Sequence, residues 1–318
     1  MTNKKKILKP FDYLFVLRPM LFFPGWSTLL AGYFISRKAG IYSNLSEIAA
    51  VNNKTVILLL FLFAAAMGAG FLLNQLKDIE SDRKNKKLFI ISEGHISVKA
   101  VIIETAFLIV SALLAALFVN NYVFWLTAAF IIVTGYIYNY RPFCFKDSPL
   151  KSLLANTAMG WLAFAAGWAA NLEPDWQIII DSLPYLCINT ALYFYTTLPD
   201  LEGDKSSGKN TFAVVLGLKP VLSAAFILFI TGIVSAVILH DNTALLILLL
   251  SAPFFVLTLI ENSIASAVRT VKFSILFFAL AVCLKWPLYF VLMLAGFYFT
   301  KIYFKIRFDF DYPNFKGK

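Results

Sequence analysis

Long apolar runs, almost free of charge, constrain this chain more than any other feature of its sequence. One of them begins at Val56 and reaches Lys77 before it meets a charged residue. A helix needs about 20 apolar residues to cross a bilayer, whereas membrane β-strands show short alternating patterns. Of the 318 residues, 60% are hydrophobic and 14% are charged, against about a quarter charged in a soluble domain. These features exclude a water-soluble or disordered chain and predict a polytopic α-helical membrane protein.

The apolar runs divide into ten predicted spans that use most of the chain. They cover residues 14–36, 55–76, 98–118, 121–140, 150–170, 177–198, 219–240, 243–262, 271–286 and 287–304. Only Lys285, Trp286 and Pro287 separate the last two spans, so we expect nine or ten transmembrane helices. No linker rich in Pro, Gly or Ser interrupts the chain. Residues 1–318 are therefore expected to form a single integral-membrane domain.

Positive charge is distributed unevenly between alternate loops. The formal net charge is +10, and Lys and Arg gather at residues 4–6, in every second loop, and in the segment after Lys301. The first loop on the other side, which contains Arg37, is the exception. Because Lys and Arg are retained on the cytoplasmic side of membrane proteins, both ends of the chain are predicted to lie in the cytoplasm. This topology explains the charge without a nucleic-acid partner.

Acidic residues are concentrated in two short windows, which follow the second and the sixth predicted spans. The six residues are Asp78, Glu80 and Asp82 in the first window and Asp200, Glu202 and Asp204 in the second. Residues four apart share one face of a helix, which is the spacing of Asn74, Asp78 and Asp82 and of Asp200 and Asp204. An even number of spans separates the windows. Both windows should therefore lie at the same membrane surface.

The composition of these windows indicates a metal and a diphosphate. Facing carboxylates repel each other strongly at low dielectric constant unless cations lie between them. Oxygen ligands, joined here by the amide oxygen of Asn74, suit Mg²⁺, which completes its coordination with water and substrate phosphate. Basic residues lie beside the acids: Lys77, Arg83, Lys84, Lys205 and Lys209. Such an alternation predicts a metal–diphosphate complex in which the bases neutralise phosphate oxygens.

Other functions are compatible with the same residues. The charged residues could belong to ordinary solvated loops. A carboxylate pair could also serve an acid–base hydrolase, but such an enzyme would not need two matched pairs with flanking lysines. A divalent-cation transporter is the main alternative, although transport sites usually lie near the membrane midplane. A scaffold that only binds prenyl lipids would need no metal-binding aspartates.

Several segments resemble the UbiA-type intramembrane prenyltransferases. NQLKDIESD, at residues 74–82, looks like the first aspartate-rich motif of that family, N-x-x-x-D-x-x-x-D. DLEGDKSSGKNTFAVVLG, at residues 200–217, looks like the second motif. RPMLFFPGW (18–26), EGHIS (93–97) and YIYNYRPFCFKDSPL (136–150) also resemble segments of that family. The resemblance extends over nearly the whole chain.

The resemblance implies both a fold and a reaction. The fold is a helical bundle, commonly of nine helices, around a central cavity that opens near the cytoplasmic side. The reaction is Mg²⁺-dependent transfer of a polyprenyl group from an isoprenyl diphosphate to a lipophilic acceptor, in lipid or quinone biosynthesis. The enzyme would reside in a bacterial or archaeal cell membrane, with its active site facing the cytoplasm. Neither the acceptor, nor the prenyl chain length, nor the oligomeric state can be derived from the sequence.

The same resemblance assigns roles to individual residues. The expected metal ligands are Asn74, Asp78, Asp82, Asp200 and Asp204, and the four aspartates are the expected catalytic residues. The expected diphosphate contacts are Asn74, Lys77, Arg83, Lys146 and Lys205.

The chain departs from the family pattern in one loop, and it carries polar residues inside some spans. The family often has Tyr-x-x-x-Lys in the fourth loop, whereas Tyr140 is followed at that spacing by Cys144. Lys146 is the nearest lysine and the candidate replacement. Asn156 and Asn189 lie within spans, where they could contact an acceptor or form hydrogen bonds between helices.

Overall fold

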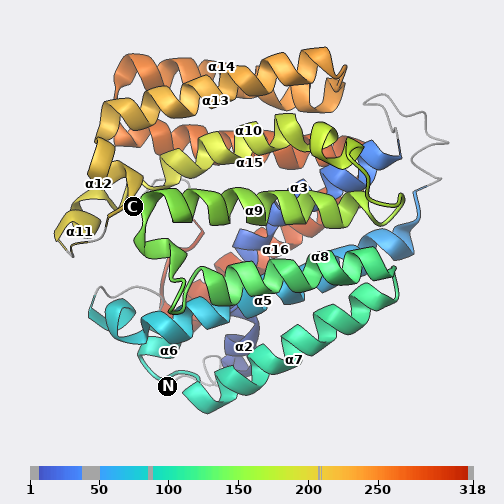
Figure 1. The fold of residues 1–318 in the computed structure, drawn as a ribbon. Helices are drawn as coiled ribbons and strands as arrows, with labels where there is room; N and C mark the ends of the chain where they lie inside the picture. The colour runs from blue at the N-terminus through green and yellow to red at the C-terminus, as the bar shows by residue number, and fades with distance from the viewer. Residues whose placement is uncertain (1–6, 38–50, 85–88, 207, 209, 314–318) are drawn as a thin grey trace.

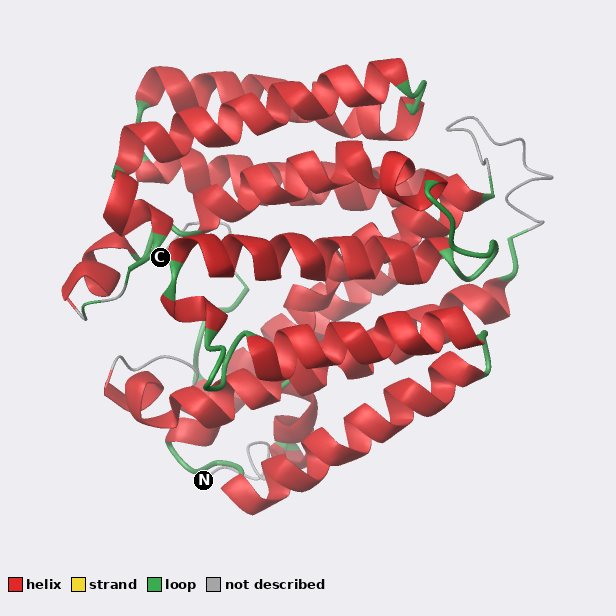
Figure 2. Cartoon of the chain, in the orientation of Figure 1, coloured by secondary structure: helices red, strands yellow, loops and turns green. Residues whose placement is uncertain are grey.

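The computed structural model describes residues 7–37, 51–84, 89–206, 208 and 210–313. Within these ranges, all the assigned secondary structure is helical, which confirms the all-α fold class (Figures 1 and 2). Most of the long helices lie side by side along a similar direction (Figure 1). The predictions for Lys209, for the lysines at 4–6 and for the side chain of Lys84 lie outside the described residues.

Each predicted span overlaps a long helix. These helices are α3 (Phe22–Ser36), α5 (Asn53–Lys84), α7 (Val98–Leu117), α8 (Asn121–Ile131), α9 (Pro149–Trp168), α10 (Gln177–Thr196), α13 (Leu218–Ile238), α14 (Asn242–Glu261), α15 (Ile264–Lys285) and α16 (Leu288–Phe308). The shorter elements are η1 (Lys9–Phe11), α2 (Asp12–Phe15), η2 (Pro19–Leu21), α6 (Phe89–Ser92), η3 (Ile132–Ile137), η4 (Phe145–Asp147), α11 (Leu201–Ser206) and α12 (Phe212–Leu216).

Within the described ranges, eight helical stretches are long and apolar enough to cross a membrane. They are Lys9–Ser36, Asn53–Glu80, Val98–Leu117, Gln177–Thr196, Leu218–Ile238, Asn242–Glu261, Ile264–Lys285 and Leu288–Phe308. The apolar helix Asn121–Ile137 is shorter, and α9 is not in this set. These spans identify the chain as an integral membrane protein. The expected number of nine or ten membrane crossings remains a prediction.

Trp286 and Pro287 separate the last two helices. Proline lacks the N–H that a position inside a helix needs, so it is tolerated at a helix start. α15 ends at Lys285, and Pro287 occupies the N-cap of α16. The indole Nε1 of Trp286 donates to Oδ1 of Asn53 at 2.7 Å. The last two predicted spans are therefore two separate helices.

Glycines allow α3 and α9 to pack backbone against backbone. A Cβ on Gly167 would lie 1.8 Å from the carbonyl oxygen of Leu29, and a Cβ on Gly32 would lie 2.0 Å from that of Phe164. Small residues permit such close approach in membrane bundles, where packing rather than the hydrophobic effect holds helices together. The α3–α9 crossing therefore requires glycine on both helices.

α5 carries the first aspartate-rich motif beyond its apolar part. Its 32 residues extend over about 48 Å, more than the ~30 Å hydrocarbon core of a bilayer. Because the helix continues to Lys84, Asn74, Asp78 and Asp82 share one face, as predicted. The C-terminal end of α5 and the short helix α11, which carries Asp204, lie at the same end of the bundle, on the left in Figure 1.

Candidate functional site

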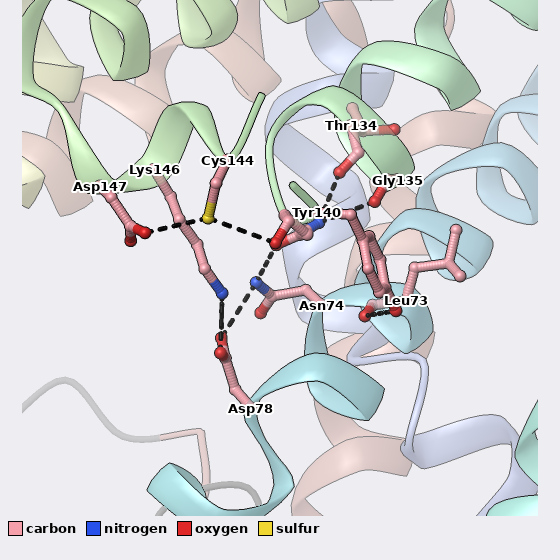
Figure 3. Close-up of polar contacts among 10 residues, drawn as sticks. Leu73, Asn74, Asp78, Thr134, Gly135, Tyr140, Cys144, Lys146 and Asp147 are labelled. Carbon is pink, nitrogen blue, oxygen red and sulfur yellow. Dashed lines mark hydrogen bonds and ion pairs between the residues drawn. The ribbon is translucent and has the colours of Figure 1, made fainter. Parts of the chain in front are cut away.

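Asp78 lies at the centre of a polar network near the end of α5 (Figure 3). Nζ of Lys146 lies 2.7 Å from Oδ1 and 2.8 Å from Oδ2 of Asp78. One turn earlier on α5, Nδ2 of Asn74 donates to Oδ2 of Asp78 at 3.3 Å. Both members of the ion pair are half-buried, so water screens it less than an exposed pair. The structure thus brings together three of the predicted site residues.

Asn139 supports this network from the segment after α8. Its Oδ1 accepts a hydrogen bond from Nδ2 of Asn74 at 2.6 Å. Its own Nδ2 donates to the carbonyl oxygens of Thr134, at 2.9 Å, and Gly135, at 3.1 Å. Both carbonyls belong to η3, a π-helical turn, and such turns are frequent at functional sites. With Nδ2 of Asn74 engaged in this way, its Oδ1 is the atom through which Asn74 would bind a cation.

Asn139 is not among the site residues predicted from the sequence. A π-helical turn contains one extra residue, so it changes which side chains share a helix face, and no hydrophobic period predicts it. The only available signal was a polar residue within the aromatic stretch YIYNY.

Tyr140 fixes the same segment to α5. Its hydroxyl donates to the carbonyl oxygen of Leu73 at 3.0 Å (Figure 3). Burial, and then the negative charge of Asp78, raise the pKa of Tyr140 above its ordinary value. The phenol is therefore protonated at neutral pH and keeps this hydrogen bond.

The loop between α8 and α9 directs Lys146 to Asp78. Cys144 has a left-handed backbone conformation with φ 41°, and its thiol donates to Oδ2 of Asp147 at 3.0 Å. Burial raises the pKa of Cys144, and the hydrogen bond to Asp147 adds to the effect. The thiol is therefore protonated at neutral pH, which disfavours it as a metal ligand or nucleophile. Lys146, two residues further on, is the lysine that reaches the first motif.

Three other predicted site residues lie in the first motif or directly after it. Lys77 is exposed, with Nζ 6.0 Å from the ring centroid of Tyr140. Arg83 donates from Nε to the carbonyl oxygen of Ser92 at 3.0 Å, which joins the end of α5 to α6. Asp82 is half-buried and interacts electrostatically with Arg18.

The second motif forms one turn at the start of α11. The backbone N–H of Asp204 donates to the carbonyl oxygen of Asp200 at 2.7 Å, so the two aspartates are one helical turn apart. Asp200 and Lys205 are exposed, whereas Asp204 is half-buried. α11 lies at the end of the bundle where α5 ends (Figure 1).

The donor groups at these motifs fit Mg²⁺ that arrives with a phosphate. In the part of the chain that the structure describes, no three His, Cys, Asp or Glu side chains lie close enough to hold a metal together. Mg²⁺ commonly binds one or two protein carboxylates and takes its remaining ligands from water and substrate phosphates. Asp78 already holds a cationic group, the ammonium of Lys146. The arrangement suits a metal shared with substrate better than a closed protein cage.

Asn156 and Asn189, which the sequence offered as possible acceptor contacts, form hydrogen bonds within the protein. Asn156 donates from Nδ2 to the carbonyl oxygen of Ser152 at 2.8 Å, within α9. Asn189 donates from Nδ2 to Oγ1 of Thr28 at 3.1 Å, which links α10 to α3. The contact of Asn189 favours a role in helix packing, whereas that of Asn156 stays within its own helix.

The sequence model of the UbiA prenyltransferase family matches residues 25–270. A structure of a UbiA homolog from Archaeoglobus fulgidus bound to GPP and Mg²⁺ is similar in fold, with a TM-score of 0.64 and 21% sequence identity. The similarity covers 86% of this chain and 99% of that one. At this level of identity, the likeness demonstrates a shared fold.

Two plant proteins are similar in sequence. One is a probable homogentisate phytyltransferase 2 of Oryza sativa, 30% identical over 191 residues, or 55% of this chain and 49% of the relative. The other is a 2-acyl-4-prenylphloroglucinol 6-prenyltransferase of Humulus lupulus, 29% identical over 177 residues, or 52% of this chain and 43% of the relative. The matches thus span about half the length of these relatives. Both relatives are chloroplastic, so they do not support the expected bacterial or archaeal membrane.

Proposed function

The chain belongs to the UbiA prenyltransferase family, and from this premise we propose that it is a Mg²⁺-dependent intramembrane prenyltransferase. It would transfer a polyprenyl group from an isoprenyl diphosphate to a lipophilic acceptor. The observation that carries the proposal is the network at Asp78. There the carboxylate of Asp78, near the C-terminal end of α5, binds the ammonium of Lys146. The helix α11 of the second aspartate-rich motif lies at the same end of the bundle.

The metal ligands in this proposal are Asn74, Asp78, Asp82, Asp200 and Asp204. Bound Mg²⁺ would supply the positive charge that holds the diphosphate and stabilises it as a leaving group. The protein's own contribution is to orient these oxygens. The buried amide of Asn139 does this for Asn74, through the 2.6 Å hydrogen bond between them.

The diphosphate would contact Lys146 most closely. Its ammonium already lies on a carboxylate of the first motif, so it is positioned to neutralise charge that develops on the diphosphate as the C1–O bond breaks. Lys77 and Arg83 are exposed near the end of α5, and Lys205 is exposed on α11, a helix that lies at the same end of the bundle (Figure 1). These three side chains would raise the local concentration of the anionic substrate through longer-range attraction.

The apolar bundle would protect the reacting carbon from water. Breaking the C1–O bond develops an allylic cation, which water would quench. The described helices bury an extensive apolar and aromatic core, and aromatic faces stabilise cations. A new bond to C1 would then form at the acceptor, and the acceptor would release a proton.

We propose a phenolic ring as the acceptor. The two plant relatives are named for homogentisate and for an acylphloroglucinol, both of which are hydroxylated aromatic compounds. An electron-rich ring carbon is a suitable nucleophile for an allylic cation. Ether lipids and other lipophilic acceptors remain the competing class for this site.

We also propose that the aspartate end of the bundle faces the cytoplasm. The support is the distribution of Lys and Arg, which gather in the loops at that membrane surface. Mg²⁺ and the charged diphosphate group of the substrate would reach the site from that side.

The family match favours this function over divalent-cation transport. Lys146 also opposes transport, because its ammonium occupies the carboxylate that a permeating cation would need. An alternating-access transporter would further place its ion site near the midplane, whereas Asp78 lies near the end of α5.

Lipid mass spectrometry of host membranes tests the proposal and identifies the acceptor. Membranes from cells with and without the gene are compared, and purified protein is then supplied with Mg²⁺, geranylgeranyl diphosphate and homogentisate. We expect one prenylated aromatic species to disappear with the gene and a prenylated ring to form in vitro. Identical lipid profiles, together with no consumption of any isoprenyl diphosphate, would refute the proposal.

A further inference from the structure

A hydrogen bond joins α9 to α10 near the end of the bundle that carries the aspartate-rich motifs. The hydroxyl of Tyr193, in the last turn of α10, donates to Oγ of Ser152, in the first turn of α9, at 2.8 Å. Ser152 is buried, and Tyr193 is half-buried. α9 begins and α10 ends at the end of the bundle where α5 ends (Figure 1). The contact therefore links two helices at the point where each meets the chain segment of the site.

Ser152 is connected to the first motif by a short, hydrogen-bonded stretch of chain. Lys146, whose ammonium lies 2.7 Å from Oδ1 of Asp78, comes six residues before Ser152. The backbone N–H of Lys146 donates to the carbonyl oxygen of Tyr138 at 3.1 Å. The backbone N–H of Ser152 donates to the carbonyl oxygen of Ser148 at 2.8 Å. Ser152 thus has a defined position relative to the Asp78–Lys146 pair.

Tyr193 is connected to the second motif by a series of hydrogen-bonded turns. The backbone N–H of Leu198, a fully buried residue, donates to the carbonyl oxygen three residues earlier at 3.3 Å. The N–H of Leu201 donates to the carbonyl oxygen of Leu198 at 3.2 Å. The N–H of Asp204 closes the next turn onto the carbonyl oxygen of Asp200 at 2.7 Å. Because these turns are hydrogen-bonded, a shift of Tyr193 would be transmitted to both aspartates.

We propose that Tyr193 is a positioning residue for the aspartate-rich site: through its hydrogen bond to Ser152, it sets the distance between the second motif and the Asp78–Lys146 pair. Tyr193 acts through Ser152 and not on the reacting atoms. A site that shares Mg²⁺ and a diphosphate between two motifs needs its ligands held to within about 0.5 Å of their working positions. The inference rests on the proposed function.

A second contact between the same helices provides a matched control. The Oγ1 atoms of Thr157 on α9 and Thr190 on α10 lie 3.4 Å apart, about one turn further from the motifs. Hydrogen bonds between membrane helices add only modest stability, so removing either contact should leave the bundle folded. Only the loss of the contact between Tyr193 and Ser152 should alter the site.

The Mg²⁺ dependence of diphosphate release from geranylgeranyl diphosphate tests this inference. The quantity measured on the purified full chain is the Mg²⁺ concentration that gives half the maximal rate. Removing a group that orients metal ligands commonly weakens metal binding by about ten- to a hundredfold, so Tyr193→Phe should raise this concentration about tenfold. Ser152→Ala, which removes the acceptor on the other helix, should raise it equally. Thr157→Val should stay within about twofold of the wild type.

A double-mutant cycle separates positioning from general loosening of the fold. If Tyr193 acts through Ser152, the protein with both Tyr193→Phe and Ser152→Ala should need no more Mg²⁺ than either single variant. Additive effects, a wild-type Mg²⁺ requirement in Tyr193→Phe, or an equal rise in Thr157→Val would overturn the inference while leaving the proposed function intact. A wild-type protein that releases no diphosphate with Mg²⁺ would overturn the proposed function, and this inference with it.

Discussion

Lys146 shows how a loop can move a functional group by two residues. The family resemblance implies a lysine at position 144, where this chain has a cysteine. The left-handed backbone at Cys144 and the short helix η4 bring the ammonium of Lys146 onto Asp78 instead. Sequence spacing alone left this replacement open, because a loop conformation with positive φ at a non-glycine residue is not predictable from periodicity.

Replacing Lys146 by methionine tests its role at the diphosphate. Lys146→Met keeps most of the aliphatic chain and removes the charge that would stabilise the leaving group. We expect prenyl transfer to fall about 100-fold, the usual cost of losing one such group. Lys151→Met is the matched control, because Lys151 is an exposed lysine in the following turn. A Lys146→Met enzyme with the wild-type rate would show that this ammonium has no part in the reaction.

Cys144 should react slowly with alkylating reagents at neutral pH. Burial and the contact with Asp147 raise its pKa, so the reactive thiolate is scarcer at pH 7–8 than for an ordinary cysteine. The alkylation rate should rise only as the pH approaches the raised pKa. Asp147→Asn lowers the pKa and should accelerate the reaction at pH 8. Site-resolved mass spectrometry of iodoacetamide labelling measures both rates, and equal rates in the two proteins would contradict this account.

Among the helices, the membrane-spanning elements are predictable because each needs a long apolar run. The ends of the predicted spans agree with helix ends to within a few residues for most of the chain, and the break at Trp286 and Pro287 is where proline requires it. The π-helical turn η3 and the short helix α6 were not expected. They depend on tertiary contacts such as Asn139 with Asn74, which no local pattern encodes.

Gly167 tests the crossing of α3 and α9. A side chain at this position would meet the backbone of Leu29, which has no rotamer to move aside. Gly167→Ala should therefore destabilise the bundle by about 3 kcal/mol, at the upper end for overpacking. In Gly160→Ala on the same helix, the new Cβ would lie 3.7 Å from Asn189, an ordinary contact. Thermal unfolding in detergent compares the two, and equal midpoints would refute the predicted crossing.

Asp12 tests the link between α2 and α16. Asp12→Ala leaves the buried guanidinium of Arg307 without its carboxylate, which typically costs about 3–5 kcal/mol. Thermal unfolding should show a marked loss of stability. Lys305→Ala breaks the exposed ion pair between Lys305 on α16 and Asp309, four residues later at the C-cap, and should leave the midpoint unchanged. An Asp12→Ala protein with the wild-type unfolding midpoint would show that the Asp12–Arg307 ion pair does not hold α2 against α16.

For the molecule as a whole, the sequence predicts the class of site better than its assembly. The spacing of Asp78 and Asp82, repeated in Asp200 and Asp204, predicts two acidic faces at one membrane surface, and the structure has both motifs at one end of the bundle (Figure 1). The supporting contacts of Asn139 with Asn74 and of Lys146 with Asp78 come from a segment distant in sequence. Such long-range contacts were not derivable from composition or spacing.

The central claim is that both aspartate-rich motifs serve one Mg²⁺-dependent diphosphate site. It is tested most directly by the release of diphosphate from geranylgeranyl diphosphate at saturating Mg²⁺, in the wild type, Asp78→Asn and Asp204→Asn. These substitutions keep the shape of the side chain and remove its charge. Glu202→Gln, at an exposed acid of the second motif, is the matched control. We predict a loss of at least about 100-fold in either aspartate variant and little change in the control; full turnover in Asp78→Asn and Asp204→Asn would contradict the account.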